Sequence, residues 1–238
     1  DGSARKKDRI KTLELDDPRH AFAESYRNLR SALLFMPQER KGCRTLLVTS
    51  AIPGEGKSTI SADLAITLAH GGARVLLVDA DLRRGMIHDF FKTQLKPGLA
   101  DVLLQESNWA NALATNSVPN LTLLSRGENP ARPGEMFLSP AMDIFLRESR
   151  ERFDYIIIDS APVLAADDCA NLAPKVDGVL FVVRADYTPA RLAQNALSQL
   201  YQRQTKVLGL VFNAVDVRGR EYYYYKYSNY YYYGSKKG

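Results

Sequence analysis

Short apolar runs alternate along the chain with longer segments in which apolar residues recur every three or four positions. The apolar runs predict strands at residues 44–50, 74–79, 120–125, 154–159, 178–184 and 206–213. The helical spacing predicts helices at about 18–36, 57–70, 139–151 and 188–203, with weaker patterns between 84 and 115. Strands that are apolar along their whole length are typical of a parallel sheet covered on both faces. The predicted fold class is therefore α/β, with a mainly parallel sheet and helices on both faces.

Two helix ends carry signals of their own. Thr188 followed by Pro189 is typical of a helix start, with threonine as the N-cap and proline in the first turn. Gly71 and Gly72 predict the end of the helix that begins near residue 57.

Length and charge suggest one domain with two differently composed ends. The 238 residues suit a single α/β domain, which we assign to residues 18–217. Residues 1–17 show no periodicity and are interpreted as a linker or leader, and residues 218–238 as a tail. Of the net charge of +5, the tail carries +4. Two cysteines are too few for a disulfide framework, which favours a reducing cytoplasm, and no apolar run approaches the roughly 20 residues that span a bilayer.

Tyrosine dominates the tail, without the alternation of a strand or the spacing of a helix. The nine tyrosines are Tyr222, Tyr223, Tyr224, Tyr225, Tyr227, Tyr230, Tyr231, Tyr232 and Tyr233. We expect a mobile, disordered segment that offers one chemical group many times. Because that group is a phenolic hydroxyl, phosphorylation is the expected modification.

A glycine-rich loop joins the strand at 44–50 to the helix at 57–70. It reads Ala-Ile-Pro-Gly-Glu-Gly-Lys-Ser-Thr over residues 51–59, and strand, loop and helix in this order are the context of a phosphate-binding loop. Its glycines let backbone N–H groups approach phosphate oxygens, its lysine would reach the β- and γ-phosphates, and its serine would bind Mg²⁺. Asn213, which ends the last strand, could hydrogen-bond a purine edge or simply form a turn. The predicted nucleotide-binding residues are Gly54, Glu55, Gly56, Lys57, Ser58, Thr59 and Asn213.

Three carboxylates lie where predicted strands end. Asp79 and Asp81 follow the second strand, and Asp159 ends the fourth. Ligands of open parallel sheets bind outside the carboxyl ends of the strands, and Mg²⁺ takes one or two carboxylates together with phosphate oxygens. The sequence therefore predicts a Mg·ATP site, in which one of the two neighbouring aspartates could bind metal while the other accepts or orients a proton.

These residues resemble the bacterial tyrosine kinases associated with capsule and exopolysaccharide export, over roughly residues 18–233. The shared features are the phosphate loop, the Asp79-x-Asp81-x-Arg83 element known there as Walker A′, the Walker B strand ending at Asp159, and the tyrosine cluster. MinD/ParA-type ATPases have a related fold, but they carry a lysine near the start of the loop where this chain has Ile52. The resemblance implies a P-loop fold of the MinD/ParA-related type.

The resemblance also implies an assembly. Glu24, Arg27 and Arg30 have the spacing of the family's oligomerisation motif and lie on one helical stripe, which alone would suggest a solvated face. The resemblance instead implies a homo-oligomeric ring and a transmembrane activator or fused membrane segment. It further implies a cognate tyrosine phosphatase, a place in the cytoplasm at the inner face of the membrane, and no nucleic-acid partner.

The expected activity is transfer of phosphate from Mg·ATP to tail tyrosines of neighbouring subunits. Lys57 would stabilise the transferring phosphoryl group, and Asp79 would orient or deprotonate the phenol. Ser58, Asp81 and, through water, Asp159 would hold Mg²⁺. Two alternatives stay open: an ATPase switch of the MinD/ParA type with no protein substrate, and a nucleic-acid binder that uses the basic, aromatic tail.

Overall fold

A computed structural model describes residues 20–37 and 42–216. The predicted leader and the tyrosine tail, with all nine of its tyrosines, lie outside the described residues. The described residues fall within the predicted central domain.

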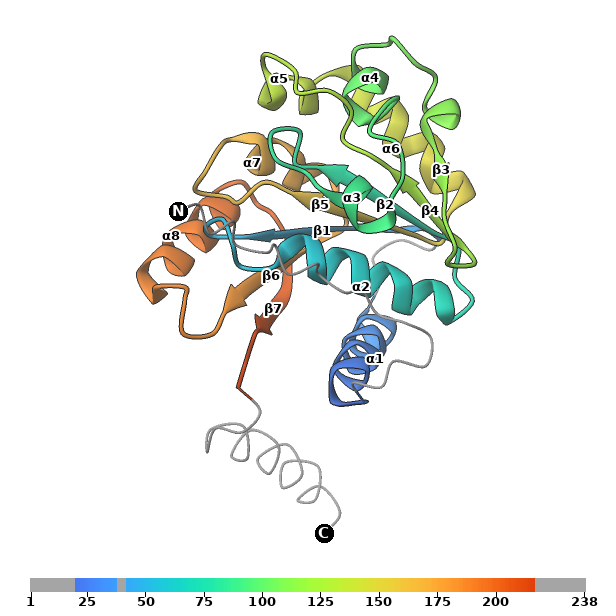
Figure 1. Cartoon of the computed structure of the whole chain (residues 1–238). Coiled ribbons are helices and arrows are strands. Elements are labelled where there is room, and N and C mark those ends of the chain that lie inside the picture. Colours follow the sequence, from blue (N-terminus) through green and yellow to red (C-terminus); the bar gives the residue numbers. More distant parts are fainter. Residues whose placement is uncertain (1–19, 38–41, 217–238) are drawn as a thin grey trace, which may run out of the picture.

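One sheet of seven strands runs through the domain in the order β3-β4-β2-β5-β1-β6-β7 (Figure 1). The strands are β1 (Arg44–Ser50), β2 (Val75–Ala80), β3 (Ala114–Thr115), β4 (Leu121–Leu124), β5 (Tyr155–Ser160), β6 (Gly178–Arg184) and β7 (Val207–Asn213). All neighbours pair in parallel except β3 with β4. The six predicted strands are thus confirmed, and the added β3 is a two-residue edge strand too short to leave a periodic signal.

Helices cover both faces of the sheet, as the apolar strands predicted (Figure 1). The helices are α1 (His20–Phe35), α2 (Lys57–His70), α3 (Ile87–Phe91), α4 (Leu99–Leu103), α5 (Pro133–Phe137), α6 (Pro140–Arg152), α7 (Asp168–Leu172) and α8 (Ala190–Gln202), with 3₁₀ turns at Trp109–Ala112 and Ala173–Lys175. Alternate residues of one strand enter different cores. Leu46 of β1 packs with α1 and α2, whereas Leu47 packs with α6, α7 and α8.

The two predicted helix ends have different outcomes. Gly71 and Gly72 do end α2, since their N–H groups bond to carbonyls of the last turn and Gly72 has a φ of +90°. The assignment of Thr188 as an N-cap is wrong: α8 begins at Ala190, and Pro189 occupies the cap position. The Thr188 hydroxyl instead accepts from the Arg184 N–H (3.0 Å) and donates to a carboxylate of the phosphate loop.

The β7 edge of the sheet exposes apolar side chains. Leu210 and Phe212 are 61% and 59% exposed, and the register between β6 and β7 shifts between Val179 and Leu180. Within residues 20–37 and 42–216 no further strand pairs with β7, so these side chains lie at an edge of the sheet. None of the helices within the described ranges is long and apolar enough to cross a membrane.

Phe145 of α6 provides a test of the core. Its ring is 1% exposed and meets Trp109 edge-on, with ring centroids 5.9 Å apart. We expect Phe145→Ala to lower the free energy of unfolding by about 3–5 kcal/mol, because it removes buried apolar surface and leaves a cavity. Urea denaturation followed by circular dichroism measures this. The neighbouring Ile144, 43% exposed, is the matched control. An equal loss of stability in Ile144→Ala would contradict the placing of Phe145 in the core.

Candidate nucleotide site

The phosphate loop lies between β1 and the first turn of α2, as the sequence predicted. Gly54 and Gly56 have φ angles of +85° and +93°, a region of backbone space that favours glycine. Gly56 is the N-cap of α2, and the helix begins at Lys57, which is buried. The loop therefore brings backbone N–H groups to the positive end of a helix of 14 residues, an arrangement that favours phosphate.

Glu55 holds the loop from behind. Its carboxylate has no exposure, accepts from the Ile52 N–H (2.6 Å), and accepts from the Thr188 hydroxyl. The Asn213 amide donates to the Glu55 carbonyl (2.8 Å), and its oxygen accepts from the Ala214 N–H (2.8 Å). Glu55 and Asn213 therefore fix the shape of the loop in this arrangement, whereas the sequence predicted them as direct contacts of the nucleotide.

Two residues that the sequence analysis did not assign hold the outer side of the loop. The Tyr187 phenol donates to the Pro53 carbonyl (3.1 Å), and the Arg184 guanidinium donates to the Gly54 carbonyl (2.8 Å). The guanidinium also lies over the Tyr187 ring, 5.0 Å from its centroid. Arg184 is the last residue of β6 and Tyr187 follows it by three positions, and this place at the carboxyl end of the strand was the signal that could have found them.

Two of the three predicted carboxylates, Asp79 and Asp159, lie side by side. β2 and β5 are neighbours, and Asp79 stands opposite Asp159 in their register. Both are fully buried; Asp159 accepts from the Ser61 hydroxyl (3.1 Å) and Asp79 from the Ile87 N–H (3.0 Å). One oxygen of each, Oδ1 of Asp79 and Oδ2 of Asp159, has no hydrogen-bond partner among the described residues. Because a buried acceptor without a partner is costly, this pair fits a site that a cation or water completes.

Burial and mutual repulsion disfavour the charged forms of this pair. Burial raises the pKa of Asp159 to about 6, although the nearby Lys57 ammonium and the Ser58 hydroxyl act in the opposite direction. Burial and the charge of Asp159 raise the pKa of Asp79 well above its ordinary value. A divalent cation bound here would favour both ionised carboxylates and so lower both pKa values.

The segment after β2 closes over Asp79. The Cα of Gly85 lies so close to the Asp79 carboxylate that a Cβ there would overlap it, which requires glycine. Asp81, half-buried beyond the end of β2, accepts from the Arg84 N–H (2.9 Å). Arg83 forms a bidentate ion pair with the buried Asp168 of α7 (2.7 and 3.1 Å). The segment that carries Asp81 is therefore fixed to a helix distant in sequence.

The residues present fit Mg²⁺ bound together with phosphate. Within the described ranges, no three His, Cys, Asp or Glu side chains form a metal cluster by themselves. Ser58 follows Lys57 in the first turn of α2, and both Ser58 and Asp81 influence the titration of Asp159. One hydroxyl and two carboxylates near a phosphate cradle suit a cation that also takes phosphate oxygens and waters.

The predicted oligomerisation residues lie on α1. Glu24 and Arg27 are exposed and form an ion pair (3.1 Å). Arg30 is turned toward α2 and donates to the Thr67 carbonyl (3.3 Å), near the glycine that ends that helix. Of the predicted stripe, Glu24 and Arg27 therefore face outward, while Arg30 joins α1 to α2.

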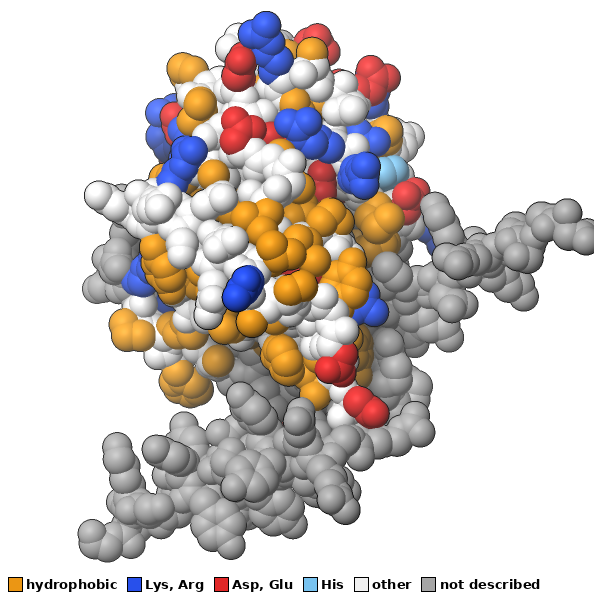
Figure 2. Space-filling model, turned by 90° about the vertical axis from the view of Figure 1, so that its left-hand side faces the viewer, with side chains coloured by type: hydrophobic (Ala, Val, Ile, Leu, Met, Phe, Trp, Pro, Cys, Tyr) orange, Lys and Arg blue, Asp and Glu red, His pale blue; other side chains and the backbone are white. Residues whose placement is uncertain are grey.

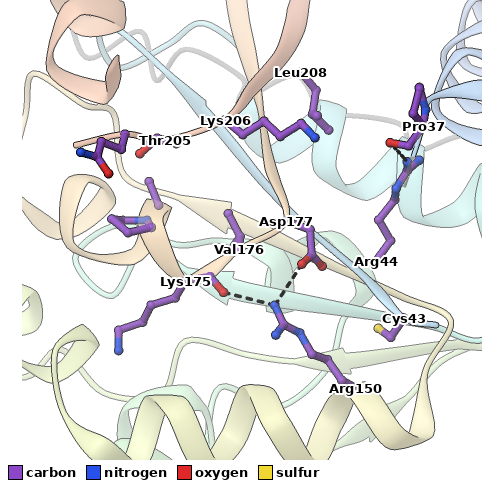
Figure 3. A pocket seen from close by; sticks show the side chains of 13 residues that line it. Pro37, Cys43, Arg44, Arg150, Lys175, Val176, Asp177, Thr205, Lys206 and Leu208 are labelled. Atoms are coloured by element: carbon purple, nitrogen blue, oxygen red, sulfur yellow. Dashed lines mark hydrogen bonds and ion pairs between the residues drawn. The ribbon is translucent and has the colours of Figure 1, made fainter. Parts of the chain in front are cut away.

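A cavity of about 270 Å³ lies elsewhere, near the start of β1 and of β7 (Figure 3). Its cations are already engaged. Arg44 donates to the carbonyls of Leu33 and Met36 at the end of α1, and Arg150 pairs with Asp177 (3.6 Å). The lining is thus explained by the packing of α1 and α6.

The face on which β1 leads into α2 turns toward the viewer in Figure 2. Hydrophobic side chains occupy much of its middle, and charges of both signs are interspersed above them. Taken together, the cradle, the buried lysine and the paired carboxylates at the strand ends define a P-loop nucleotide-binding protein of the α/β class.

Comparisons with known proteins narrow this class. A family model described as an AAA domain matches residues 44–210. The putative tyrosine-protein kinase EpsB of Ralstonia nicotianae is 39% identical over 209 residues, which are 88% of this chain and 27% of EpsB. The tyrosine-protein kinase YwqD of Bacillus subtilis is 33% identical over 90% of both chains. The solved kinase domain of the Escherichia coli tyrosine kinase ETK superposes with a TM-score of 0.81 at 28% identity, covering 89% of this chain and 84% of that one.

The chain therefore belongs to the bacterial tyrosine-protein kinases. It spans about a quarter of the length of EpsB but nearly the whole of YwqD. The predicted family and fold are confirmed.

The raised pKa of Asp159 predicts how stability without metal depends on pH. The folded protein binds this proton more tightly than the unfolded chain does, since the pKa rises from 3.8 to about 6. The stabilisation is therefore complete below about pH 4 and is lost as the pH rises through about 6. At pH 7.5 we expect Asp159→Asn to raise the free energy of unfolding of the metal-free protein by about 1–3 kcal/mol.

Denaturant titrations between pH 4 and 8 measure this effect. Asp154 gives a control of opposite sign, because its hydrogen bonds with Arg74 lower its pKa. Asp154→Asn should therefore reduce stability above pH 4. If Asp159→Asn instead lowers the free energy of unfolding of the metal-free protein at pH 7.5, the ionised Asp159 carboxylate does not destabilise the fold and the prediction is wrong.

Proposed function

We propose that the chain is an ATP-dependent protein-tyrosine kinase that phosphorylates its C-terminal tyrosines in trans within an oligomer and thereby regulates exopolysaccharide or capsule synthesis and export. One observation carries the proposal: two buried carboxylates with unpaired oxygens stand opposite each other beside a phosphate loop and its buried lysine. The names of the relatives support transfer to tyrosine.

The residues of the loop bind and orient ATP. Lys57 and the N–H groups at the start of α2 stabilise negative charge on the γ-phosphoryl group as it transfers. Ser58 and Asp81 would hold Mg²⁺, and Asp159 would hold it through water. When bound, the metal neutralises charge on the β- and γ-phosphate oxygens.

Asp79 acts on the tyrosine phenol that accepts the phosphate. In the arrangement described here its carboxyl is covered by Gly85, and its raised pKa favours the protonated form. We therefore assign it a role that begins when the backbone at Gly85 moves off the carboxyl, with Asp81 and Arg83 keeping their places, and when metal and nucleotide occupy the site. The ionised carboxylate then orients the phenol and takes its proton, while positioning against the γ-phosphate contributes most of the acceleration.

The oligomer delivers the acceptor. A ring built on Glu24, Arg27 and Arg30 would place the tail of one subunit at the site of the next. The exposed Glu24–Arg27 pair supports a contact on this side of α1. The proposal includes a transmembrane activator or fused membrane segment, a cognate phosphatase that resets the tail, and a location in the cytoplasm at the inner face of the membrane.

Replacing Lys57 tests the chemistry. With Mg·ATP, we expect intact mass spectrometry of the wild-type protein to show successive additions of one phosphate, mapped to residues 222–233. Lys57→Met should lower their rate by at least about 100-fold, because it removes a cation that stabilises the transferring group.

A variant with all nine tail tyrosines replaced by phenylalanine is the matched control, since it keeps the whole nucleotide site. It should bind and turn over ATP but accept no phosphate on the tail. ATP hydrolysis by the wild type without any phosphotyrosine, even with a membrane activator added, would favour an ATPase switch of the MinD/ParA type.

Tail charge predicts how phosphorylation affects assembly. Each phosphate adds a charge of about −1.5 to −2, so three phosphates reverse the net +4 of residues 218–238. We expect the fully phosphorylated protein to show a lower mass in light scattering, because the tail is then repelled from acidic surface near the site. A variant with Glu24 and Arg27 replaced by alanine gives the mass without the ring. An unchanged mass after phosphorylation contradicts the prediction.

A further inference from the structure

A tyrosine outside the tail lies against the phosphate loop. Tyr187 follows β6, is 48% exposed, and is held to the loop by the hydrogen bond from its phenol to the Pro53 carbonyl. A single neutral hydrogen bond is easily exchanged for one with water. The phenol can therefore be reached by a second molecule. It lies beside the loop that binds the phosphates of ATP in its own chain.

The neighbour of this phenol is suited to a phosphate. The Arg184 guanidinium lies over the ring and donates to the Gly54 carbonyl, so the phenol and the guanidinium hold two consecutive loop carbonyls. A phosphate on Tyr187 would replace the O–H donor by acceptor oxygens and end the bond to Pro53. Arginine pairs strongly with phosphate, so Arg184 could exchange the Gly54 carbonyl for it.

We propose that Tyr187 is a further autophosphorylation site and that its phosphate slows the kinase by weakening ATP binding. The inference rests on the proposed function. The added charge of about −1.5 to −2 stands beside the loop that receives the phosphates of ATP, and like charges repel. The loop also loses the hydrogen bond from Tyr187 to the Pro53 carbonyl. If Arg184 turns to the phosphate, the loop loses the hydrogen bond to the Gly54 carbonyl too.

The transfer is the same reaction as on the tail. The phenolic oxygen of Tyr187 forms a bond to the γ-phosphorus, and the bond from that phosphorus to the β–γ bridging oxygen breaks. Its electron pair leaves with ADP, and the phenolic proton passes to a carboxylate of the donor site. The phenol lies on the carbonyl side of its own loop, whereas phosphate binds the N–H side. The donor is therefore a second copy of the chain.

Mixing two variants tests the site. The acceptor carries Lys57→Met and phenylalanine at all nine tail tyrosines, and the donor is the wild-type chain with Mg·ATP. Peptide mapping should find phosphate on Tyr187 of the acceptor and not on Tyr201, which is 58% exposed near the end of α8 and serves as the internal control. A phosphorylated donor tail with an unmodified Tyr187 overturns the inference alone. No phosphotyrosine in either chain overturns the proposed function as well.

The effect on the kinase has its own readout. The parent with nine phenylalanines and an intact Lys57 is incubated with Mg·ATP, and its KM for ATP is then measured with a separate peptide of residues 218–238 as acceptor. We expect the KM to rise about fivefold after incubation, as for repulsion between partly exposed charges. Adding Tyr201→Phe should leave this rise intact, and adding Tyr187→Phe should abolish it. Phosphate on Tyr187 without a change in KM overturns the regulatory role.

Discussion

The charge density at the ends of β2 and β5 constrains the rest of the molecule. Asp79 and Asp159 stand opposite each other with no exposure, and each leaves one oxygen without a partner. Such a pair is stable only if one carboxyl holds a proton or a cation lies between them. Lys57 supplies part of that compensation from α2, which explains why a lysine that is meant to reach phosphate is itself buried.

Contacts from distant parts of the chain cover this carboxylate pair and fix the conformation of the phosphate loop. Gly85 closes over Asp79, and the bidentate pair of Arg83 with Asp168 ties the covering segment to α7. The Thr188 hydroxyl, four residues after β6, donates to the Glu55 carboxylate of the loop. The site is thus held by side chains from elements that meet only in the folded sheet, and its rigidity depends on the sheet order.

The parts of the site that the sequence predicted correctly are local. The loop at residues 51–59 joins a strand to a helix, and the aspartates end apolar runs, so pattern and chemistry coincide within a few residues. The contacts of Tyr187 and Arg184 with the outer side of the loop were missed because they join residues more than 100 positions apart, as with Tyr187 and Pro53. Thr188 was misassigned for the same reason: its hydroxyl found a carboxylate that only tertiary structure brings near. The five-residue helices α3, α4, α5 and α7 are too short for a period and depend on packing.

The exposed β7 edge matters for how the protein behaves in solution. Leu210 and Phe212 lie on an open edge strand, the kind of surface on which chains associate side by side into insoluble aggregates. The shifted register with β6 twists that edge, and the basic residues from 218 onward follow it within a few positions. Charged residues that flank an apolar strand act as gatekeepers against aggregation. Neutralising the basic residues that follow β7 in the sequence would therefore remove this protection from the β7 edge.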